Sequence, residues 1–322
     1  MSRPIVAITI DTEEDNWGEY SWDGATVQNI QLLPRLQEVF DRHGARPTYL
    51  VGYAPLTAAG SVGVLGELAE RSDVEIGSHC HPWNTPPRTD PGMEHSMMFR
   101  FSEEVNLRKI DAVRDRTTAE LGVTPTSFRA GRWGMGPTVT KALHRSGFHL
   151  DCSVTPLVDW SSIGGPDYGR APLMPYRFDP ERPLVPDSSG AMVQLPTTVG
   201  FNRGDQVRKA RVRRALETSV LSKLKVVGGL DKLGLLAMRW LSPETTSGRE
   251  MIKLVDGWMG DGRNFLQMTF HSCTLLPGAT PFVRDEGDQL RFLGWVDEVL
   301  GHLSRCDAQF ETLSSAAAAL EL

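Results

Sequence analysis

The stretch IVAITIDTEEDNWGEY (residues 5–20) begins as a strand and ends in a cluster of acids. Its first six residues are apolar or β-branched, a composition typical of a strand buried on both faces. Asp11, Glu13, Glu14 and Asp15 follow at once. Crowded carboxylates repel one another and lose solvation when buried. The cluster therefore indicates either a solvated loop or a site where a cation or a proton-transfer reaction holds the acids in place.

The composition is that of a soluble globular protein: 322 residues, 40% hydrophobic and 23% charged. This length suits two domains or a single α/β barrel. The net charge of −6 argues against general binding to nucleic acid, and we find no apolar run long enough for a transmembrane segment. The N-terminus enters a strand without a secretory signal, so we expect a cytoplasmic protein. The four cysteines form no CxxC pair, which argues against a zinc knuckle or a disulfide framework.

Strand-like and helix-like segments alternate along the chain. The expected strands are 5–11, 46–53, 74–79, 126–130, 148–154, 192–198, 265–271 and 309–313. The expected helices are 29–43, 61–71, 102–121, 137–146, 206–224, 248–259 and 284–303. Several are followed by a helix-stopping glycine: Gly44, Gly122 and Gly147. This alternation predicts a parallel α/β sheet, either doubly wound or closed into a barrel.

Two segments interrupt the alternation. Residues 156–191 are rich in Gly, Pro, Asp and Ser and are expected to form a long irregular loop. Residues 203–239 contain ten Lys or Arg and three acids, within an expected basic helical insert over 203–245. A solvated helical face is the simplest interpretation of this charge. The alternative is a docking surface for a phosphate-bearing substrate or for peripheral contact with an anionic membrane.

The reactive side chains follow the ends of predicted strands. They are Asp11 and Glu13, His79 and His81, Arg129 and Arg132, and His271. In a parallel barrel these positions share one rim, where active sites are built.

GSHCHPW (77–83) places two histidines two residues apart, so both imidazoles face the same way on an extended chain. An HxH pair alone is weak evidence for a metal. Beside an acidic cluster it favours a mixed histidine and carboxylate site for an ion such as Zn²⁺, Fe²⁺ or Co²⁺.

FRAGRWGMG (128–136) places Arg129, Arg132 and Trp133 in a glycine-rich turn. An arginine beside a catalytic aspartate keeps that aspartate ionised, and an exposed tryptophan can stack on a sugar ring. In MTFHSCTLLPG (268–278), His271 ends an apolar strand and suits a general acid. It needs a carboxylate partner to raise its pKa, for which Asp159 and Asp151 are the candidates.

The ordered set of acidic cluster, histidine pair, FRxxxWG, DW and final FH resembles the polysaccharide deacetylases, the NodB-homology superfamily of carbohydrate esterases. The resemblance covers about residues 5–315. It implies a deformed (β/α)7-type barrel, one domain over 1–322, that uses a divalent metal to remove acetyl groups from amino sugars. Zn²⁺ is the expected ion, with Co, Fe, Ni or Mn as alternatives.

The resemblance also implies roles for individual residues. Asp11 resembles the base that activates a metal-bound water, Arg129 the arginine that braces this base, and His271 the acid that protonates the leaving amine. Asp159 resembles the aspartate that tunes the acid. Glu13, His79 and His81 correspond to the metal ligands, and Trp83, Arg132, Trp133 and Trp160 are the expected substrate-binding residues.

Three departures from the family pattern leave alternatives open. The first motif reads DTE instead of adjacent aspartates, so Glu14 or Asp15 could replace Glu13 as ligand. The second motif spaces its histidines two apart instead of four, which makes His81 the substitute ligand. The third motif has one additional residue, so Arg129 and Arg132 compete for the bracing role.

The expected function is therefore metal-dependent deacetylation of an amino sugar, a glycan intermediate, or a nucleotide- or lipid-linked sugar. One alternative is hydrolysis of a non-sugar linear or cyclic amide. A non-catalytic carbohydrate-binding barrel is a weaker alternative, because base, ligands and acid are all present.

Overall fold

The computed structural model describes residues 3–90, 92–218 and 236–322. Its main sheet is built around β1 (Ile5–Thr12), in which all eight residues are buried. The other strands of this sheet are β2 (Pro47–Val51), β3 (Glu75–Cys80), β4 (Ser127–Ala130), β5 (Leu150–Asp151), β6 (Tyr176–Phe178), β7 (Met192–Gln194), β10 (Phe265–His271) and β11 (Gln309–Phe310). A separate two-stranded sheet pairs β8 (Val199–Phe201) with β9 (Met238–Trp240).

The main sheet has the order β10-β1-β2-β3-β4-β5-β7-β6, with β11 paired to β1. Only β6 runs antiparallel, so seven consecutive strands from β10 to β7 are parallel. The segment after β7 bridges the gap between β10 and the β5 side. Thr197 N–H donates to Val154 O at 3.0 Å, and Gln267 N–H donates to Thr198 Oγ1 at 2.8 Å. The barrel is thus closed by irregular backbone, which confirms the expected deformed (β/α)7-type barrel.

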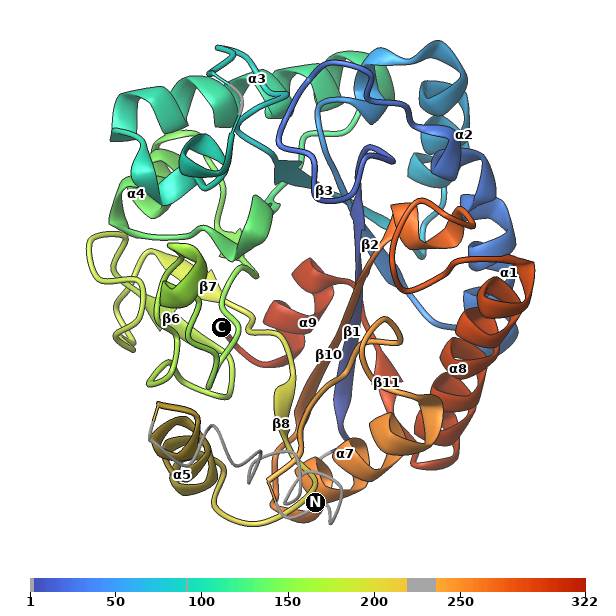
Figure 1. Cartoon of the computed structure of the whole chain (residues 1–322), viewed down its shortest axis with the longest axis vertical. Coiled ribbons are helices and arrows are strands. Elements are labelled where there is room, and N and C mark those ends of the chain that lie inside the picture. Colours follow the sequence, from blue (N-terminus) through green and yellow to red (C-terminus); the bar gives the residue numbers. More distant parts are fainter. Residues whose placement is uncertain (1–2, 91, 219–235) are drawn as a thin grey trace.

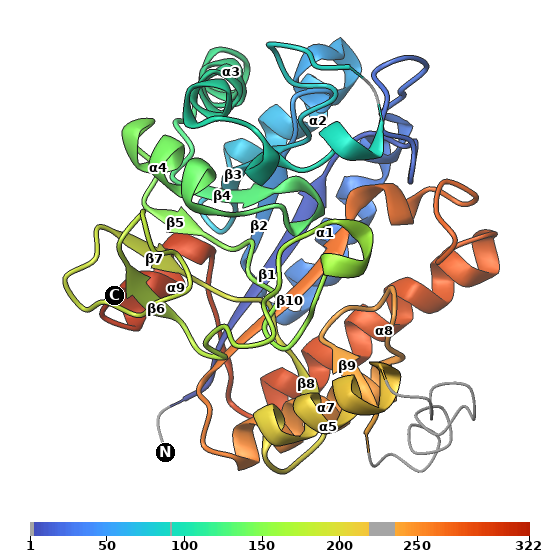
Figure 2. The ribbon, with the colours of Figure 1, turned by 60° about the vertical axis from the view of Figure 1, so that its left-hand side comes forward.

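Helices cover the outside of the curled sheet (Figure 1). They are α1 (Leu33–His43), α2 (Ala59–Ala69), α3 (Glu103–Leu121), α4 (Pro137–Arg145), α5 (Gln206–Thr218), α7 (Gly248–Gly260), α8 (Glu286–Arg305) and α9 (Leu313–Ala319). Helix α5 contacts β8 and lies on the far side of the molecule from α2, as Figures 1 and 2 both show. Within the described residues, no helix is both long and apolar enough to cross a membrane.

Local sequence signals fix the ends of these helices. Helix α1 ends at Gly44, whose left-handed φ of 60° lets its N–H close back on Phe40 O and Asp41 O. Helix α3 begins where Ser102 Oγ accepts from Val105 N–H, and it ends at Gly122 with a φ of 68°. The predicted stop signals at these two glycines are therefore confirmed.

Helix α9 closes one end of the barrel. Its residues Leu313, Ala316 and Ala317 pack with buried side chains from β1, β10 and neighbouring strands, such as Ile5 and Phe265. These contacts lie at the amino-terminal ends of the strands. The other end, where the parallel strands terminate, is left for polar side chains.

All eight predicted strands and all seven predicted helices have a counterpart in the structure. The short strands β6, β8 and β9 and the helix α9 were not predicted. Residues 156–191 are irregular, as expected, apart from a single 3-10 turn at Ser161–Ile163 and β6. The last part of the predicted helix 206–224 lies outside the described residues.

Candidate active site

Strand register brings the predicted residues together at the carboxyl ends of the strands. In the β1 and β10 pair, Asp11 is aligned with His271. In the β3 and β4 pair, His79 is aligned with Arg129. Since β10, β1, β2, β3 and β4 are consecutive in the sheet, the carboxyl ends of β10, β1, β3 and β4 lie close together. Their side chains form one buried polar cluster.

Arg129 is fully buried and holds Asp11. Its Nη1 donates to Asp11 Oδ1 at 2.5 Å, and its remaining donors bond to Thr269 Oγ1, Thr9 Oγ1 and Cys152 O. Burial by itself would raise the pKa of Asp11, but the charges of Arg129, His79 and His271 outweigh it, so the pKa is lowered. Asp11 is therefore held as a carboxylate, and of the two arginines in the motif it is Arg129 that contacts it.

Glu13, His79 and His81 form the predicted group of ligands. Glu13 Oε2 lies 3.3 Å from Nε2 of each histidine, and the two Nε2 atoms are 3.0 Å apart. All three side chains are buried. Burial, with smaller contributions from Glu14 and Asp11, raises the pKa of Glu13 to about 7 against the opposing charges of His271 and His81. Three lone-pair donors of the kind zinc prefers thus point at one position.

Glu14 supports this group from behind. Its Oε1 accepts from His81 Nδ1 at 2.8 Å and from Trp83 Nε1 at 3.1 Å. Trp83 in turn stacks on the His81 ring with centroids 4.0 Å apart. Gly131 permits this packing, because a Cβ at that position would lie 2.3 Å from His81 Cδ2. The orientation of His81 is fixed by these three neighbours.

Glu14 and Asp15 are the two alternatives to Glu13 as ligand. Both are buried, and only Glu14 supports a ligand. Asp15 instead accepts from Thr26 Oγ1, Gln28 N–H and Asn29, and so ties the loop after β1 to the segment before α1. The four acids therefore have different partners: Asp11 contacts Arg129, Glu13 the two histidines, Glu14 the far side of His81, and Asp15 the loop before α1.

His271 contacts a carboxylate that the sequence analysis did not identify. Glu244 lies against its Nδ1, with both carboxylate oxygens at 3.1 Å, and also accepts from His271 N–H and Thr274 Oγ1. The other ring nitrogen, Nε2, lies 3.6 Å from Asp11 Oδ2. Burial would lower the pKa of His271, but Glu244, Glu13 and Asp11 raise it to about 10. His271 is therefore an imidazolium at neutral pH.

The expected partners of His271 lie elsewhere. Asp159 forms an ion pair with Arg214 of α5 at 2.5 Å and accepts from Ser161 N–H, and its backbone forms a bridge to Asp167. Asp151 is buried on β5 and accepts from Ser153, and burial raises its pKa to about 6. The structure thus places Asp159 away from His271, and Glu244 is the carboxylate that contacts the imidazole.

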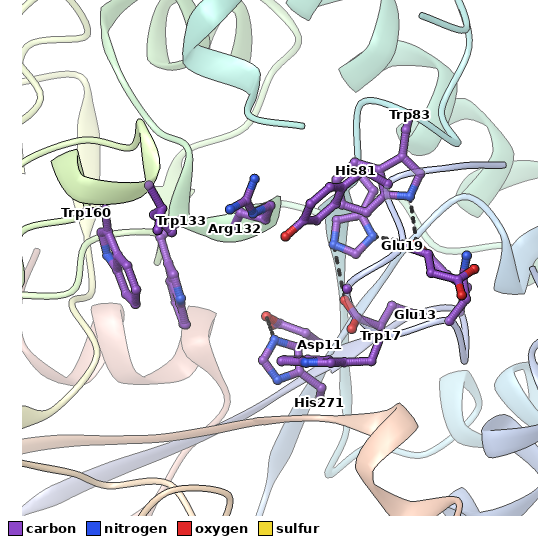
Figure 3. A pocket seen from close by; sticks show the side chains of 15 residues that line it. Asp11, Glu13, Trp17, Glu19, His81, Trp83, Arg132, Trp133, Trp160 and His271 are labelled. Carbon is purple, nitrogen blue, oxygen red and sulfur yellow. Dashed lines mark hydrogen bonds and ion pairs between the residues drawn. The ribbon is translucent and has the colours of Figure 1, made fainter. Parts of the chain in front are cut away.

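A cavity of about 220 Å³ opens over the polar cluster. The four expected substrate-binding residues all line it: Trp83, Arg132, Trp133 and Trp160. In Figure 3, Trp133 and Trp160 stand on one side, His81 and Trp83 on the other, with Arg132 between them and Asp11 and His271 below. Trp83 is largely covered by its contacts with His81 and Glu14, so it serves the ligand group as well as the cavity wall.

The loop after β1 adds two aromatic side chains that were not predicted. Trp17 meets the His271 ring edge-on at 4.7 Å, and Tyr20 meets Trp83 at 5.3 Å. Their only sequence signal is their closeness to the acidic cluster in residues 5–20. Glu244 had no such signal, because it lies in a loop outside every quoted motif.

Comparison with known proteins establishes the fold. No protein-family model and no curated protein matches the chain. Among solved structures, a candidate polysaccharide deacetylase from Mycobacterium smegmatis matches with a TM-score of 0.55 and 15% identity, over 100% of this chain and 91% of the other. A candidate glycoside hydrolase/deacetylase from Parabacteroides distasonis matches with a TM-score of 0.62 and 15% identity, over 97% and 69%.

A 4-alpha-glucanotransferase from Thermococcus litoralis matches with a TM-score of 0.50 and 12% identity, over 99% of this chain and 40% of the other. The chain thus has the barrel fold of the polysaccharide deacetylase structures, as its motifs predicted. Because the same fold also carries a transferase, the reaction has to be argued from the residues of the site.

Proposed function

We propose that the protein is a metal-dependent hydrolase that removes the acetyl group from an N-acetylated amino sugar. One observation carries the proposal: Glu13, His79 and His81, which could hold a metal ion, lie together beside a cavity that is lined by Glu13 and His81 and by the side chains of Asp11 and His271, held 3.6 Å apart. A base, an acid and a metal position are the three parts of metal-assisted amide hydrolysis.

The ligand group fits a divalent ion. Glu13 Oε2 is buried and makes no hydrogen bond within the described residues, yet both His Nε2 atoms face it. The contact of His81 Nδ1 with Glu14 places the ring proton on Nδ1, which leaves the Nε2 lone pair free. Glu13, His79 and His81 would hold the ion, and Zn²⁺ suits this donor set best. When bound, such an ion polarises the acetyl carbonyl and makes a water molecule more acidic.

Asp11 is the proposed base. Its Oδ1 is occupied by Arg129, which leaves Oδ2 to accept a proton from the attacking water. Because Arg129 also bonds to Thr9, Thr269 and Cys152, it fixes the carboxylate to three other parts of the barrel wall. This position requires little rearrangement when the proton is transferred.

His271 is the proposed acid. Glu244 holds Nδ1, so Nε2 carries the proton that can pass to the departing amine. Trp17 packs edge-to-face against the ring with centroids 4.7 Å apart. Asp11 and His271 thus divide the two proton transfers, one for attack and one for departure of the amine.

The proposed substrate is an N-acetylated amino sugar, as a small sugar, as part of a glycan intermediate, or in a nucleotide- or lipid-linked form. Aromatic walls from Trp133 and Trp160 offer flat faces for a sugar ring.

The basic segment 203–239 could bind the phosphate of a nucleotide- or lipid-linked form, but some of its charges already have acidic partners. Arg213 is paired with Glu217, and Arg214 with Asp159 and Asp167. Arg208 and Arg211 are exposed on α5, whereas Lys223, Lys225 and Lys232 lie outside the described residues.

Acetate release from a panel of N-acetylated and O-acetylated sugars, with and without a chelator, tests the proposal. We expect acetate from at least one N-acetylated sugar, loss of that activity with chelator, and recovery on adding Zn²⁺. If the protein hydrolyses a non-sugar amide and none of the sugars, the alternative function as an amidohydrolase replaces the deacetylase. Metal analysis that finds no bound ion, together with no turnover of any substrate, would favour the non-catalytic barrel.

A further inference from the structure

Arg132 is a second arginine of the site whose charge the proposed mechanism does not use. It lines the cavity beside Trp133, and its side chain is partly buried. Its guanidinium lies 4.4 Å from the centre of the Tyr20 ring, and one of its five N–H donors bonds to Ser96 Oγ. In Figure 3 the guanidinium stands between the tryptophan wall and the ligand group.

Arg132 and Arg129 come from the same motif but differ in their partners. Arg129 is paired with the Asp11 carboxylate, and its other donors are bonded to oxygens. Arg132 has no carboxylate within 4.0 Å among residues 3–90, 92–218 and 236–322, although Glu13 and Glu19 line the same cavity. Burial of Arg132, together with the nearby charge of Arg100, lowers its pKa, and Tyr20 opposes this only in part. Partial burial of a guanidinium costs free energy when no anion is paired with it. A bound ligand with an anionic group would offset this cost.

The backbone conformation at position 132 does not favour an arginine. Arg132 and Trp133 both adopt left-handed conformations, with φ of 53° and 57°. Glycine or asparagine would adopt them at less cost than a long side chain. Such outliers gather where a side chain has to be aimed at a ligand. Here the strained turn aims the guanidinium into the cavity and the indole along its wall.

We propose that Arg132 is the specificity residue that binds an anionic group of the substrate, so that the substrate is a small acetamido sugar carrying a carboxylate or a phosphate. This inference rests on the proposed deacetylase function. The planar fork of an arginine binds either oxyanion through two parallel hydrogen bonds. The cavity of about 220 Å³ that Arg132 lines is also lined by Trp133 and Trp160, so a sugar ring against the indoles can place a charged substituent beside the guanidinium.

The test compares three acetamido sugars that differ in charge: N-acetylglucosamine, N-acetylglucosamine 6-phosphate and N-acetylmuramic acid. We expect the wild-type protein to prefer one or both charged sugars over the neutral one, and the two charged arms distinguish phosphate from carboxylate. Arg132→Gln should raise KM for the preferred charged sugar by roughly 10- to 100-fold with a smaller change in kcat. For neutral N-acetylglucosamine the change in KM should be less than about threefold.

Two further variants separate charge from folding. Arg132→Gly removes the guanidinium and relieves the left-handed strain, so it should fold and show the same selective loss. Arg132→Lys retains the charge without the fork and should fall between wild type and Arg132→Gln. Arg249→Gln, at an exposed position on α7 outside the cavity, is the matched control and should leave all three KM values unchanged.

Binding without turnover keeps the two proposals distinguishable. We expect the wild type to bind glucosamine 6-phosphate or muramic acid more tightly than glucosamine in calorimetry, and Arg132→Gln to abolish the difference. If no sugar releases acetate but this difference is present, the deacetylase proposal fails and the anion site stands. If acetate is released from all three sugars equally, or if Arg132→Gln slows all three equally, the anion site is overturned and the deacetylase proposal stands.

Discussion

At the amino-terminal end of the barrel, α9 covers the strands with Leu313, Ala316 and Ala317 in an apolar cluster. At the carboxyl end, β1 and β10 carry Asp11 and His271, which line a cavity. The first end gains free energy from the removal of apolar surface from water. The second buries carboxylates and imidazoles, which is unfavourable unless charges are paired or a cation is bound. The difference predicts that substitutions at the polar end change the reaction and those at the apolar end change only stability.

The largest effect on turnover is expected for His79→Ala. This variant removes one of three converging ligands, so we expect bound metal and acetate release to be lost together. Elemental analysis of the purified variant and the acetate assay measure the two quantities. His144→Ala, on the exposed side of α4, should retain both. A variant that loses its metal and keeps its activity would show that the ligand group is not part of the reaction.

Asp11→Asn should separate metal binding from chemistry at the same end. The amide cannot accept a proton, so we expect kcat to fall by roughly 10²- to 10⁴-fold while the metal content is retained. The variant should also unfold at a lower temperature, because the buried Arg129 loses its counter-charge. Normal turnover in this variant would remove Asp11 from the role of base.

Glu14→Gln tests the side chain that orients His81. Loss of the carboxylate behind Nδ1 should weaken metal affinity by roughly 10- to 100-fold, which competition with a chelator measures. Activity at saturating Zn²⁺ should recover largely, since no ligand has been removed. Glu38→Gln, exposed on α1, is the charge-matched control. An unchanged affinity would mean that stacking by Trp83 alone positions the ring.

Glu244→Gln should change the pH profile more than the maximum rate. Glu244 is the strongest of the charges that raise the pKa of His271, so removing it lowers that pKa. Because the acid has to be protonated, activity is lost as pH rises through this pKa, and the alkaline limb should move to lower pH. Asp159→Asn is the matched control: its carboxylate pairs with Arg214 instead, so the limb should stay in place. A shift in the control alone would restore the original assignment.

These side chains also show what could be predicted from the sequence. Asp11, Glu13, His79, Arg129 and His271 were predictable because parallel strands bring their carboxyl ends to one rim, so local motifs imply a common site. Glu244 was not, because its position depends on how an irregular loop returns to β10. The contacts of Asp159 were not predictable for the same reason: its backbone forms a bridge to Asp167 in the same loop, and its carboxylate pairs with Arg214 of α5. The end of a regular strand can thus be located from the sequence pattern, whereas the contacts of an irregular loop depend on tertiary packing.

Leu313→Ala should have the smallest effect on turnover and a large effect on stability. Leu313 is fully buried in the cluster that closes the amino-terminal end, and such a truncation costs about 2–5 kcal/mol of unfolding free energy. Denaturant unfolding should show this loss, while kcat and KM stay near wild type below the unfolding transition. Leu290→Ala, whose side chain is 58% exposed on α8, should cost less than about 0.5 kcal/mol. If Leu313→Ala instead lowered kcat at full folding, the two ends would be coupled through β1, and the polar site would depend on packing at the opposite end of the same strand.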